Sequence, residues 1–299
     1  MIKADNLTKR FQGVTAVDHI HAEIQDGTVF GLIGTNGAGK STFLRMAAGI
    51  LKPDEGTITL DGEAVFEDIR VKARCFYIPD EPYFLGNGTP DDMKTFYQGI
   101  YPNFDTDRFG KLLKSFELDG RRKIQTFSKG MKKQLAVLLG ICAGTYYLFC
   151  YETFDGLDPV MRQTVKSLFA NDIEERHLTP VIASHNLREL EDICDHVGLL
   201  HRGGMLLSKD LDDMKMNIHK IQCVLPAGLD RTNLQDLDIM TTEQRGSLLT
   251  LTVRGQKEEI QARMQSYHPV FFEMIPLSLE EIFISETEVA GYDIKKLIF

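Results

Sequence analysis

The sequence predicts an α/β fold built around a mostly parallel sheet, and three observations carry this prediction. Between residues 29 and 210, short apolar runs alternate with segments of helical spacing, an order typical of parallel sheets. A glycine-rich turn at residues 34–42 separates one apolar run from the start of a helix. Residues 1–27 have the pattern of antiparallel strands, and residues 84–143 have helical spacing throughout.

The individual elements follow from local patterns. Asp26-Gly27 marks a turn before the apolar run 29–33, and alternation at residues 57–60 ends in Asp61-Gly62, which predicts a hairpin. The further elements expected are a strand at 76–78, helices at 91–100 and 105–116, a helix opened by Ser128 that runs through Leu139, a strand at 146–151, a helix at 161–176, a strand at 181–183, a helix at 187–194, and strands at 197–200 and 205–207.

A second, smaller domain is expected after residue 212, because the pattern weakens between residues 210 and 219. The elements expected there are strands at 221–225, 248–253 and 270–275, a helix at 257–266, and a last helix that starts at Ser278. The predicted organisation is therefore a domain of residues 1–212, with a helical subdomain at about 84–143, followed by an α+β accessory domain of residues 213–299.

Composition places the chain among soluble globular proteins. Hydrophobic residues make up 43% and charged residues 26%, and the formal net charge of −9 argues against nucleic acid or an anionic membrane surface as the main partner. Five cysteines, an odd number without CxxC spacing, suit buried thiols in a reducing cytosol. The first residues lack the apolar segment of a signal peptide.

One stretch calls for a membrane test. Residues 135–151 carry no charge over 17 positions. A spanning helix needs about 20 apolar residues, and glycines at 140 and 144 interrupt this run. Its second half is rich in aromatic residues, as expected for a buried strand. We therefore expect a buried helix followed by a buried strand.

The glycine-rich turn fits the pattern G-x-x-x-x-G-K-[ST] from Gly34 to Ser41. In such a turn, backbone N–H groups point inward at a helix N-terminus and form an anion site. Lys40 would contact the β- and γ-phosphates of a nucleoside triphosphate, and the Ser41 hydroxyl would ligate Mg²⁺. This predicts a P-loop NTPase core. The phosphate-binding residues expected are Gly34, Thr35, Asn36, Gly37, Ala38, Gly39, Lys40, Ser41 and Thr42.

Four downstream segments narrow the class of NTPase. In chain order they are Pro79-Asp80-Glu81-Pro82, residues 127–134 (Phe-Ser-Lys-Gly-Met-Lys-Lys-Gln), residues 152–159 (Glu-Thr-Phe-Asp-Gly-Leu-Asp-Pro), and Ala183-Ser184-His185. They resemble the Q-loop, the signature motif, the end of the Walker B motif with the D-loop, and the switch histidine of ABC ATPases. Over residues 1–210 the chain resembles the ATP-binding subunit of an ABC transporter, of the bacterial exporter type.

The resemblance implies roles for single residues. Glu152 matches the general base that polarises the attacking water, and His185 matches the contact to the γ-phosphate. Ser128 and Gly130 match the groups that reach the nucleotide of a second subunit, and Asp158 would lie across that interface. The N-cap of a helix that starts at Pro159 is the plain alternative for Asp158.

Phe11 matches the aromatic residue that stacks on adenine. Its alternative is a core position, as one of 18 phenylalanines.

The sequence departs from the family pattern at four positions. Tyr151 stands where the family has the Asp that supports Mg²⁺, and a neutral phenol cannot replace that carboxylate. Thr153 replaces a Pro, Lys129 replaces a glycine and adds a cation near the triphosphate, and Asp80 stands where Gln is usual. Asp80 is expected to restore the lost charge in or near the Mg²⁺ shell; the alternative is a solvated loop acid.

The function that this resemblance implies is ATP hydrolysis at a composite dimer interface, with ATP and Mg²⁺ bound, driving transport through separate membrane permease subunits. The partners would be a second ATP-binding subunit, identical or related, and the permease, with the chain on the cytoplasmic face of the membrane. The alternative is a regulatory subunit in which Tyr151 impairs hydrolysis. A soluble ABC protein of translation or DNA repair is a third and weaker interpretation, because those carry two cassettes or a long coiled coil.

Overall fold

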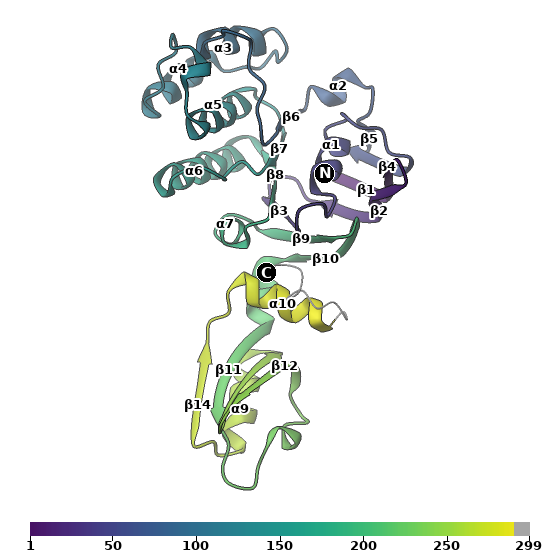
Figure 1. Ribbon diagram of the computed structural model, residues 1–299, viewed down its shortest axis with the longest axis vertical. Coiled ribbons are helices and arrows are strands. Elements are labelled where there is room, and N and C mark those ends of the chain that lie inside the picture. The colour runs from purple at the N-terminus through teal and green to yellow at the C-terminus, as the bar shows by residue number, and fades with distance from the viewer. Residues whose placement is uncertain (290–299) are drawn as a thin grey trace. The chain divides into compact units, whose positions relative to one another are not determined.

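The computed structural model describes residues 1–289, and its chain divides between Ser208 and Lys209 into two compact units (Figure 1). The first unit contains two sheets and the helices that surround them, and the second contains one further sheet. Each unit is described by itself below. The roles expected for residues 1–212 and 213–299 as nucleotide-binding and accessory domains remain predictions.

The N-terminal sheet of the first unit is antiparallel. Its hairpin at Asp61-Gly62 is confirmed: both residues have positive φ angles, +53° and +80°, as the tight turns between twisted strands require. In sheet order the strands are β2 (Val14–Ile24), β1 (Ile2–Phe11), β4 (Glu55–Leu60) and β5 (Glu63–Ala64).

The second sheet is the predicted α/β core. Strands β9, β3, β8, β7 and β6 pair in parallel, and β3 and β8 are buried along their whole length. Because these strands run in one direction, the residues that follow them meet at one edge of the sheet. In sheet order the strands are β10 (Gly204–Asp210), β9 (His196–His201), β3 (Phe30–Ile33), β8 (Thr179–Ser184), β7 (Tyr147–Tyr151) and β6 (Cys75–Ile78).

The helices of the first unit begin at the capping residues that sequence patterns favour. Thr89 and Asp92 form a reciprocal capping box, and Asp105, Ser128 and Asp158 each accept a hydrogen bond from the third residue beyond. The helices are α1 (Lys40–Ala47), α2 (Ile69–Lys72), α3 (Pro90–Gln98), α4 (Thr106–Ser115), the 3₁₀ turn η1 (Ile124–Thr126), α5 (Lys129–Cys142), α6 (Pro159–Arg176) and α7 (Leu187–Glu191).

Two of these helices differ from the predictions. Helix α7 ends at Glu191, before the expected Cys194, because the N–H groups of Asp195 and His196 donate to the Val29 carbonyl oxygen and draw the chain into β9. The Asp195 carboxylate also accepts a hydrogen bond from the Val29 N–H, at 2.7 Å. Helix α2 was not predicted, because four residues are too few to show a helical period, and the Asp68 cap is its main local signal.

The uncharged run 135–151 is confirmed as a buried helix, the end of α5, followed by the buried strand β7. Within residues 1–289, no helix has the length and apolar character needed to cross a membrane. All five cysteines are buried and free, as expected. Burial raises the pKa of the Cys75, Cys142 and Cys150 thiols to about 12.

The second unit is the predicted α+β arrangement. Its core includes Ile221 and Leu251 from the sheet, packed with Ile260 and Met264 from α9. The antiparallel sheet has the order β12 (Asp238–Arg245), β13 (Leu248–Arg254), β11 (Ile218–Val224), β14 (Phe271–Ile275), with helices α8 (Leu211–Asn217), α9 (Lys257–Ser266) and α10 (Leu279–Val289) and the 3₁₀ turn η2 (Arg231–Asn233).

Two elements of this unit were missed by the sequence analysis. Strand β12 is an edge strand without a fully buried residue, so its sequence carries no clean alternation. Helix α8 covers the stretch where the pattern weakens, and only Leu211 and Met214 are buried in it.

A fully buried acid joins the helical region to α6 in the first unit. Asp172 is 0% exposed and forms ion pairs with Arg108 of α4 and Arg176 of α6. Arg176 also donates hydrogen bonds to the carbonyl oxygens of Ile141 and Thr145. The carboxylate is therefore paired on both oxygens, as a buried charge must be.

Asp172→Ala is expected to destabilise the protein by about 3–5 kcal/mol, because it leaves two arginines without their buried partner. Urea unfolding followed by circular dichroism measures the change. Glu174→Ala, at an exposed position of the same helix, should stay within about 0.5 kcal/mol of the parent. Equal shifts for the two variants would contradict the importance of the Asp172 ion pairs.

Candidate functional site

The predicted site residues meet at the carboxyl edge of the parallel sheet. Gly34 follows β3, Glu152 follows β7 and His185 follows β8. The register places Ile33 opposite Ser184, and Tyr151 opposite Ala183. The three residues that follow these strands are therefore brought to one edge of the sheet, with Glu152 offset by one residue from the other two.

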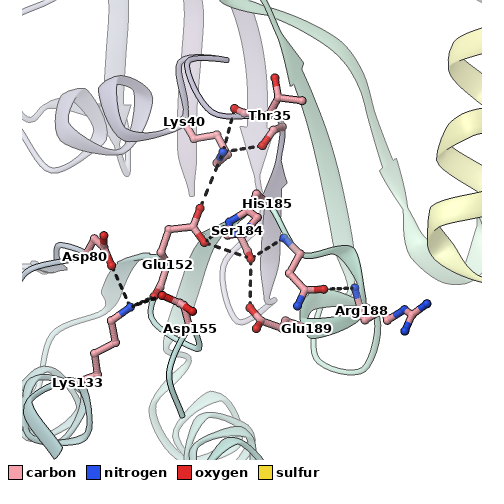
Figure 2. Close-up of polar contacts among 12 residues, drawn as sticks. Thr35, Lys40, Asp80, Lys133, Glu152, Asp155, Ser184, His185, Arg188 and Glu189 are labelled. Atoms are coloured by element: carbon pink, nitrogen blue, oxygen red, sulfur yellow. Dashed lines mark hydrogen bonds and ion pairs between the residues drawn. The ribbon is translucent and has the colours of Figure 1, made fainter. Parts of the chain in front are cut away.

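The phosphate loop closes on its own lysine. The Lys40 side chain is buried, and its Nζ donates hydrogen bonds to the carbonyl oxygens of Gly34 and Thr35, at 2.6 and 3.1 Å (Figure 2). Burial lowers the pKa of Lys40, and the nearby carboxylate of Glu152 opposes that shift. The loop thus places the Lys40 ammonium group beside the N-terminus of α1. Both carry positive charge, so together they favour an anionic ligand.

Two glycines of the loop are required by sterics. Gly39 has φ +106°, and a Cβ there would lie 2.3 Å from the carbonyl oxygen of Ala16. A Cβ at Gly34 would lie 2.5 Å from the carbonyl oxygen of Leu200. Strands β2 and β9 therefore press directly on the loop, and a side chain at either position would displace it.

Glu152 connects the loop to the end of β8. Its Oε2 lies 2.9 Å from His185 Nδ1 and 3.5 Å from the Ser184 hydroxyl oxygen (Figure 2). Its Oε1 lies 4.0 Å from Lys40 Nζ, is buried, and has no hydrogen-bond partner within the described part of the chain. A buried carboxylate oxygen without a donor suits a group that receives a hydrogen bond from a bound ligand or water.

The backbone of Glu152 is strained and held at both ends. Its φ of +49° lies in the left-handed region, which non-glycine residues rarely adopt. Its N–H donates to the carbonyl oxygen of Ala183 at 2.8 Å, and its carbonyl oxygen accepts from Lys133 Nζ at 2.5 Å. This turn directs the carboxylate back toward the phosphate loop.

Lys133, Ser184 and Glu189 belong to this cluster and were not predicted. Ser184 donates to Glu189 at 3.2 Å, and Lys133 is 2% exposed although it is a lysine. A sequence signal existed for Lys133 alone: it is the last charge before the uncharged run that starts at Leu135. A charge at the border of a buried helix segment indicates a paired group.

Asp80 has a partner other than the metal expected for it. Its Oδ1 accepts a hydrogen bond from Lys133 Nζ at 2.9 Å (Figure 2). Its side chain is 44% exposed, so Asp80 is an ion-paired acid that also contacts solvent, and the alternative of a solvated loop acid stays open. Its role as a ligand of Mg²⁺ stays a prediction, and it would have to share its carboxylate with Lys133.

Tyr151 packs against the apolar core and is half-buried. Burial raises its pKa above the ordinary value, and the negative charges of Glu152 and Asp80 raise it further. The side chain is a neutral phenol at physiological pH, so it brings no negative charge to the end of β7.

The residues present fit a nucleotide with Mg²⁺. Ser41 lies at the start of α1, where its hydroxyl would be a ligand of Mg²⁺ beside the phosphates. The described residues contain no cluster of three or more His, Cys, Asp or Glu that could hold a metal alone. Mg²⁺ bound with phosphates needs only one or two protein ligands, so this donor set is compatible with it.

Three predicted residues do not join this cluster within one chain. Ser128 is exposed and caps α5 by accepting from the Met131 N–H at 3.2 Å. Asp158 caps α6 by accepting from the Met161 N–H at 2.9 Å, which confirms the capping interpretation. Gly130 sits in the first turn of α5, where a Cβ would lie 2.9 Å from the Gly156 carbonyl oxygen.

Phe11 lies at the end of β1 and is 43% exposed, so it is not a core residue. Lys9 Nζ lies 5.4 Å from its ring centroid. Phe11 pairs with Val14 of β2. Ala16, also in β2, lies against the phosphate loop at Gly39. An exposed aromatic face therefore stands a few residues from the loop, as a base-stacking residue would.

Comparison with known proteins identifies what this chain resembles. The model of a family described as "ABC transporter" matches residues 17–154. The ABC transporter ATP-binding protein YtrB of Bacillus subtilis is 30% identical over 286 residues, which cover 96% of this chain and 98% of the relative. The bacitracin transport ATP-binding protein BcrA of Bacillus licheniformis is 31% identical over 224 residues, 74% of this chain and 73% of the relative.

Solved structures agree on the fold. An ATP-binding subunit of an ABC transporter superposes with a TM-score of 0.66 at 22% identity, covering 72% of this chain and 92% of that one. The ATP-binding cassette MJ0796, in a dimeric structure bound to ADP and Pi, gives 0.64 at 18% identity, covering 71% and 99%. At these identities the likeness shows the fold of the cassette.

The raised pKa of Tyr151 predicts a pH dependence at alkaline pH. The folded-state pKa lies above the unfolded value of about 10, so the contribution of the neutral phenol is fully present below about pH 10 and is lost as the pH rises through the folded pKa. The free energy of unfolding should therefore fall more steeply above about pH 10 in the parent than in Tyr151→Phe. Denaturant unfolding at a series of pH values tests this; identical slopes above about pH 10 would show that Tyr151 is not buried.

Proposed function

The chain belongs to the ATP-binding subunits of ABC transporters, and from that premise we propose that it hydrolyses ATP at a site completed by a second subunit. The observation that carries this proposal is the position of Glu152. Its carboxylate faces Lys40 of the phosphate loop on one side and His185 on the other, with one oxygen free of donors in the described chain.

The chemistry proposed for this chain follows from these groups. Lys40 exchanges its loop carbonyls for phosphate oxygens, and the N–H groups of residues 34–42 surround the same charge. Glu152 Oε1 accepts a proton from the attacking water, an effect worth roughly 10²–10⁴-fold in rate. His185 is more than half exposed, which leaves it room to contact the terminal phosphate. Mg²⁺ held by the Ser41 hydroxyl would neutralise charge on the phosphates.

The second subunit supplies what one chain lacks. Ser128 and the N-terminus of α5 are exposed and make no hydrogen bond to the phosphate loop of their own chain among the described contacts. We propose that they bind the γ-phosphate held by another subunit, with Asp158 at the interface and Phe11 stacked on adenine. The second subunit is either another copy of this chain or a related protein.

Membrane permease subunits are the further partners proposed. The two relatives described above are named as an ABC transporter ATP-binding protein and a bacitracin transport ATP-binding protein. We propose that this chain likewise serves an exporter-type transporter from the cytoplasmic face of the membrane, with its helical region against the permease. A hydrolysis-impaired regulatory subunit remains the alternative because Tyr151 is neutral, but the placement of Glu152 and His185 favours hydrolysis.

Lys40→Ala is expected to abolish ATP binding, whereas Glu152→Gln keeps the affinity and lowers turnover by about 10²–10⁴-fold. The reason is that Lys40 meets charge present before the reaction, and Glu152 acts on the attacking water. Equilibrium dialysis and Mg-ATP turnover of the purified chain measure both quantities. Parent turnover no faster than that of Glu152→Gln would favour the regulatory alternative, and equal loss of affinity in both variants would overturn the role assignments.

Glu152→Gln with ATP is expected to elute as a dimer, because unhydrolysed triphosphate bridges Lys40 of one chain and Ser128 of the other. Size-exclusion chromatography with light scattering, with and without ATP, measures the mass. Adding Ser128→Arg to the same variant is the control and should keep it monomeric. A molar mass that is the same with and without ATP would count against the composite site.

A further inference from the structure

A buried lysine on the signature helix has contacts that the proposed mechanism leaves unexplained. Lys133 lies one turn into α5 and is 2% exposed. Its Nζ lies 2.9 Å from Asp80 Oδ1, 2.5 Å from the Glu152 carbonyl oxygen and 3.6 Å from Asp155 Oδ2 (Figure 2). An ammonium group has three donors and no acceptor, so three oxygens arranged around it match its capacity.

These contacts join three separate segments. Asp80 follows β6, Glu152 follows β7, and Lys133 belongs to the helix that Ser128 caps. Without Lys133, the Glu152 carbonyl oxygen loses its donor and Asp80 loses its ion pair, whereas Asp155 keeps its ion pair with Lys129. The position of each segment therefore depends on the same ammonium group.

Of these contacts, the hydrogen bond from Lys133 to the Glu152 carbonyl oxygen is the one that affects the proposed ATP hydrolysis. The left-handed backbone of Glu152 is unfavourable for a non-glycine residue, of order 1–3 kcal/mol. It is held by two hydrogen bonds, one from its N–H to Ala183 and one to its carbonyl oxygen from Lys133. Without the second bond, the peptide group after Glu152 is free to rotate, and the carboxylate loses its direction toward Lys40.

We propose that Lys133 is a positioning residue for Glu152 and that Asp80 is its counter-ion. Asp80 then acts on the reaction through Lys133. A shift of the segment around Asp80 would be transmitted through one ammonium group to the backbone of the residue that activates water. The signature helix takes part because Lys133 is rigidly attached to it. This inference rests on the proposed ATP hydrolysis.

The experiment compares Lys133→Met with Lys132→Met, a neighbouring lysine of the same helix that is more exposed. Lys133→Met should lower kcat by about 10–100-fold, as expected when a catalytic group is misplaced by about 1 Å, with the ATP dissociation constant unchanged within about twofold. Lys133→Arg, which keeps a donor, should recover part of the loss. Lys132→Met should match the parent.

A second measurement is independent of turnover. Amide hydrogen exchange of residues 151–156 should be faster in Lys133→Met than in the parent and in Lys132→Met, because the turn loses one of its two anchors. If the parent does not hydrolyse ATP, the proposed function fails, and this exchange rate still decides the role of Lys133. Unchanged exchange together with unchanged kcat would overturn the inference.

The counter-ion role of Asp80 is tested by coupling. Asp80→Asn alone should lower kcat by a smaller factor than Lys133→Met, and the double variant should be no worse than Lys133→Met. The double variant also removes the carboxylate that Lys133→Met leaves without its ion pair, so it keeps the test available if Lys133→Met alone folds poorly. Losses in kcat that multiply across the two positions would show that Asp80 acts on its own.

Discussion

The parallel register of β3, β7 and β8 is the constraint on which the site depends. Since these strands run in one direction and their ends differ in register by at most one residue, the residues that follow them are brought to the same edge. The phosphate loop, Glu152 and His185 therefore meet although Glu152 and His185 both lie more than a hundred residues beyond the loop in sequence. Close packing of β2 and β9 against glycines 39 and 34 then fixes the loop above that edge.

Two buried lysines hold the Glu152 segment from opposite sides. Lys40 faces its carboxylate and Lys133 binds its carbonyl oxygen. Tyr151, directly before it, is anchored in the apolar core rather than in the polar cluster. The segment is thus held by the apolar packing of Tyr151 and by the two lysines. The family pattern places an Asp at position 151, and no other residue of β7 supplies a carboxylate in its place. Asp80 is the nearby carboxylate, and Lys133 balances its charge.

Local patterns predicted most of the fold and part of the site. The parallel core, the hairpin at Asp61-Gly62 and the buried helix and strand of residues 129–151 follow from periodicity and turn residues, and the structure confirms them. The exposed edge strand β12 and the short helix α2 left too little pattern to find. The convergence of strand ends was predictable from topology. Lys133 was not, because its ion pair to Asp80 spans 53 positions and no local rule links the two.

Lys40 has hydrogen-bond partners within its own loop, and this bears on how the protein would tell nucleotides apart under the proposed function. Lys40 holds the carbonyl oxygens of Gly34 and Thr35 in place, so the loop is shaped before any ligand arrives and recognises a phosphate chain with little reorganisation. Under the proposed function, discrimination of ATP from ADP must come from groups that reach only the third phosphate. His185 is one such group in this chain, and Ser128 of a second subunit is the other. Selectivity for ATP over ADP would then be a property of the dimer of two subunits. A single chain would have only part of it.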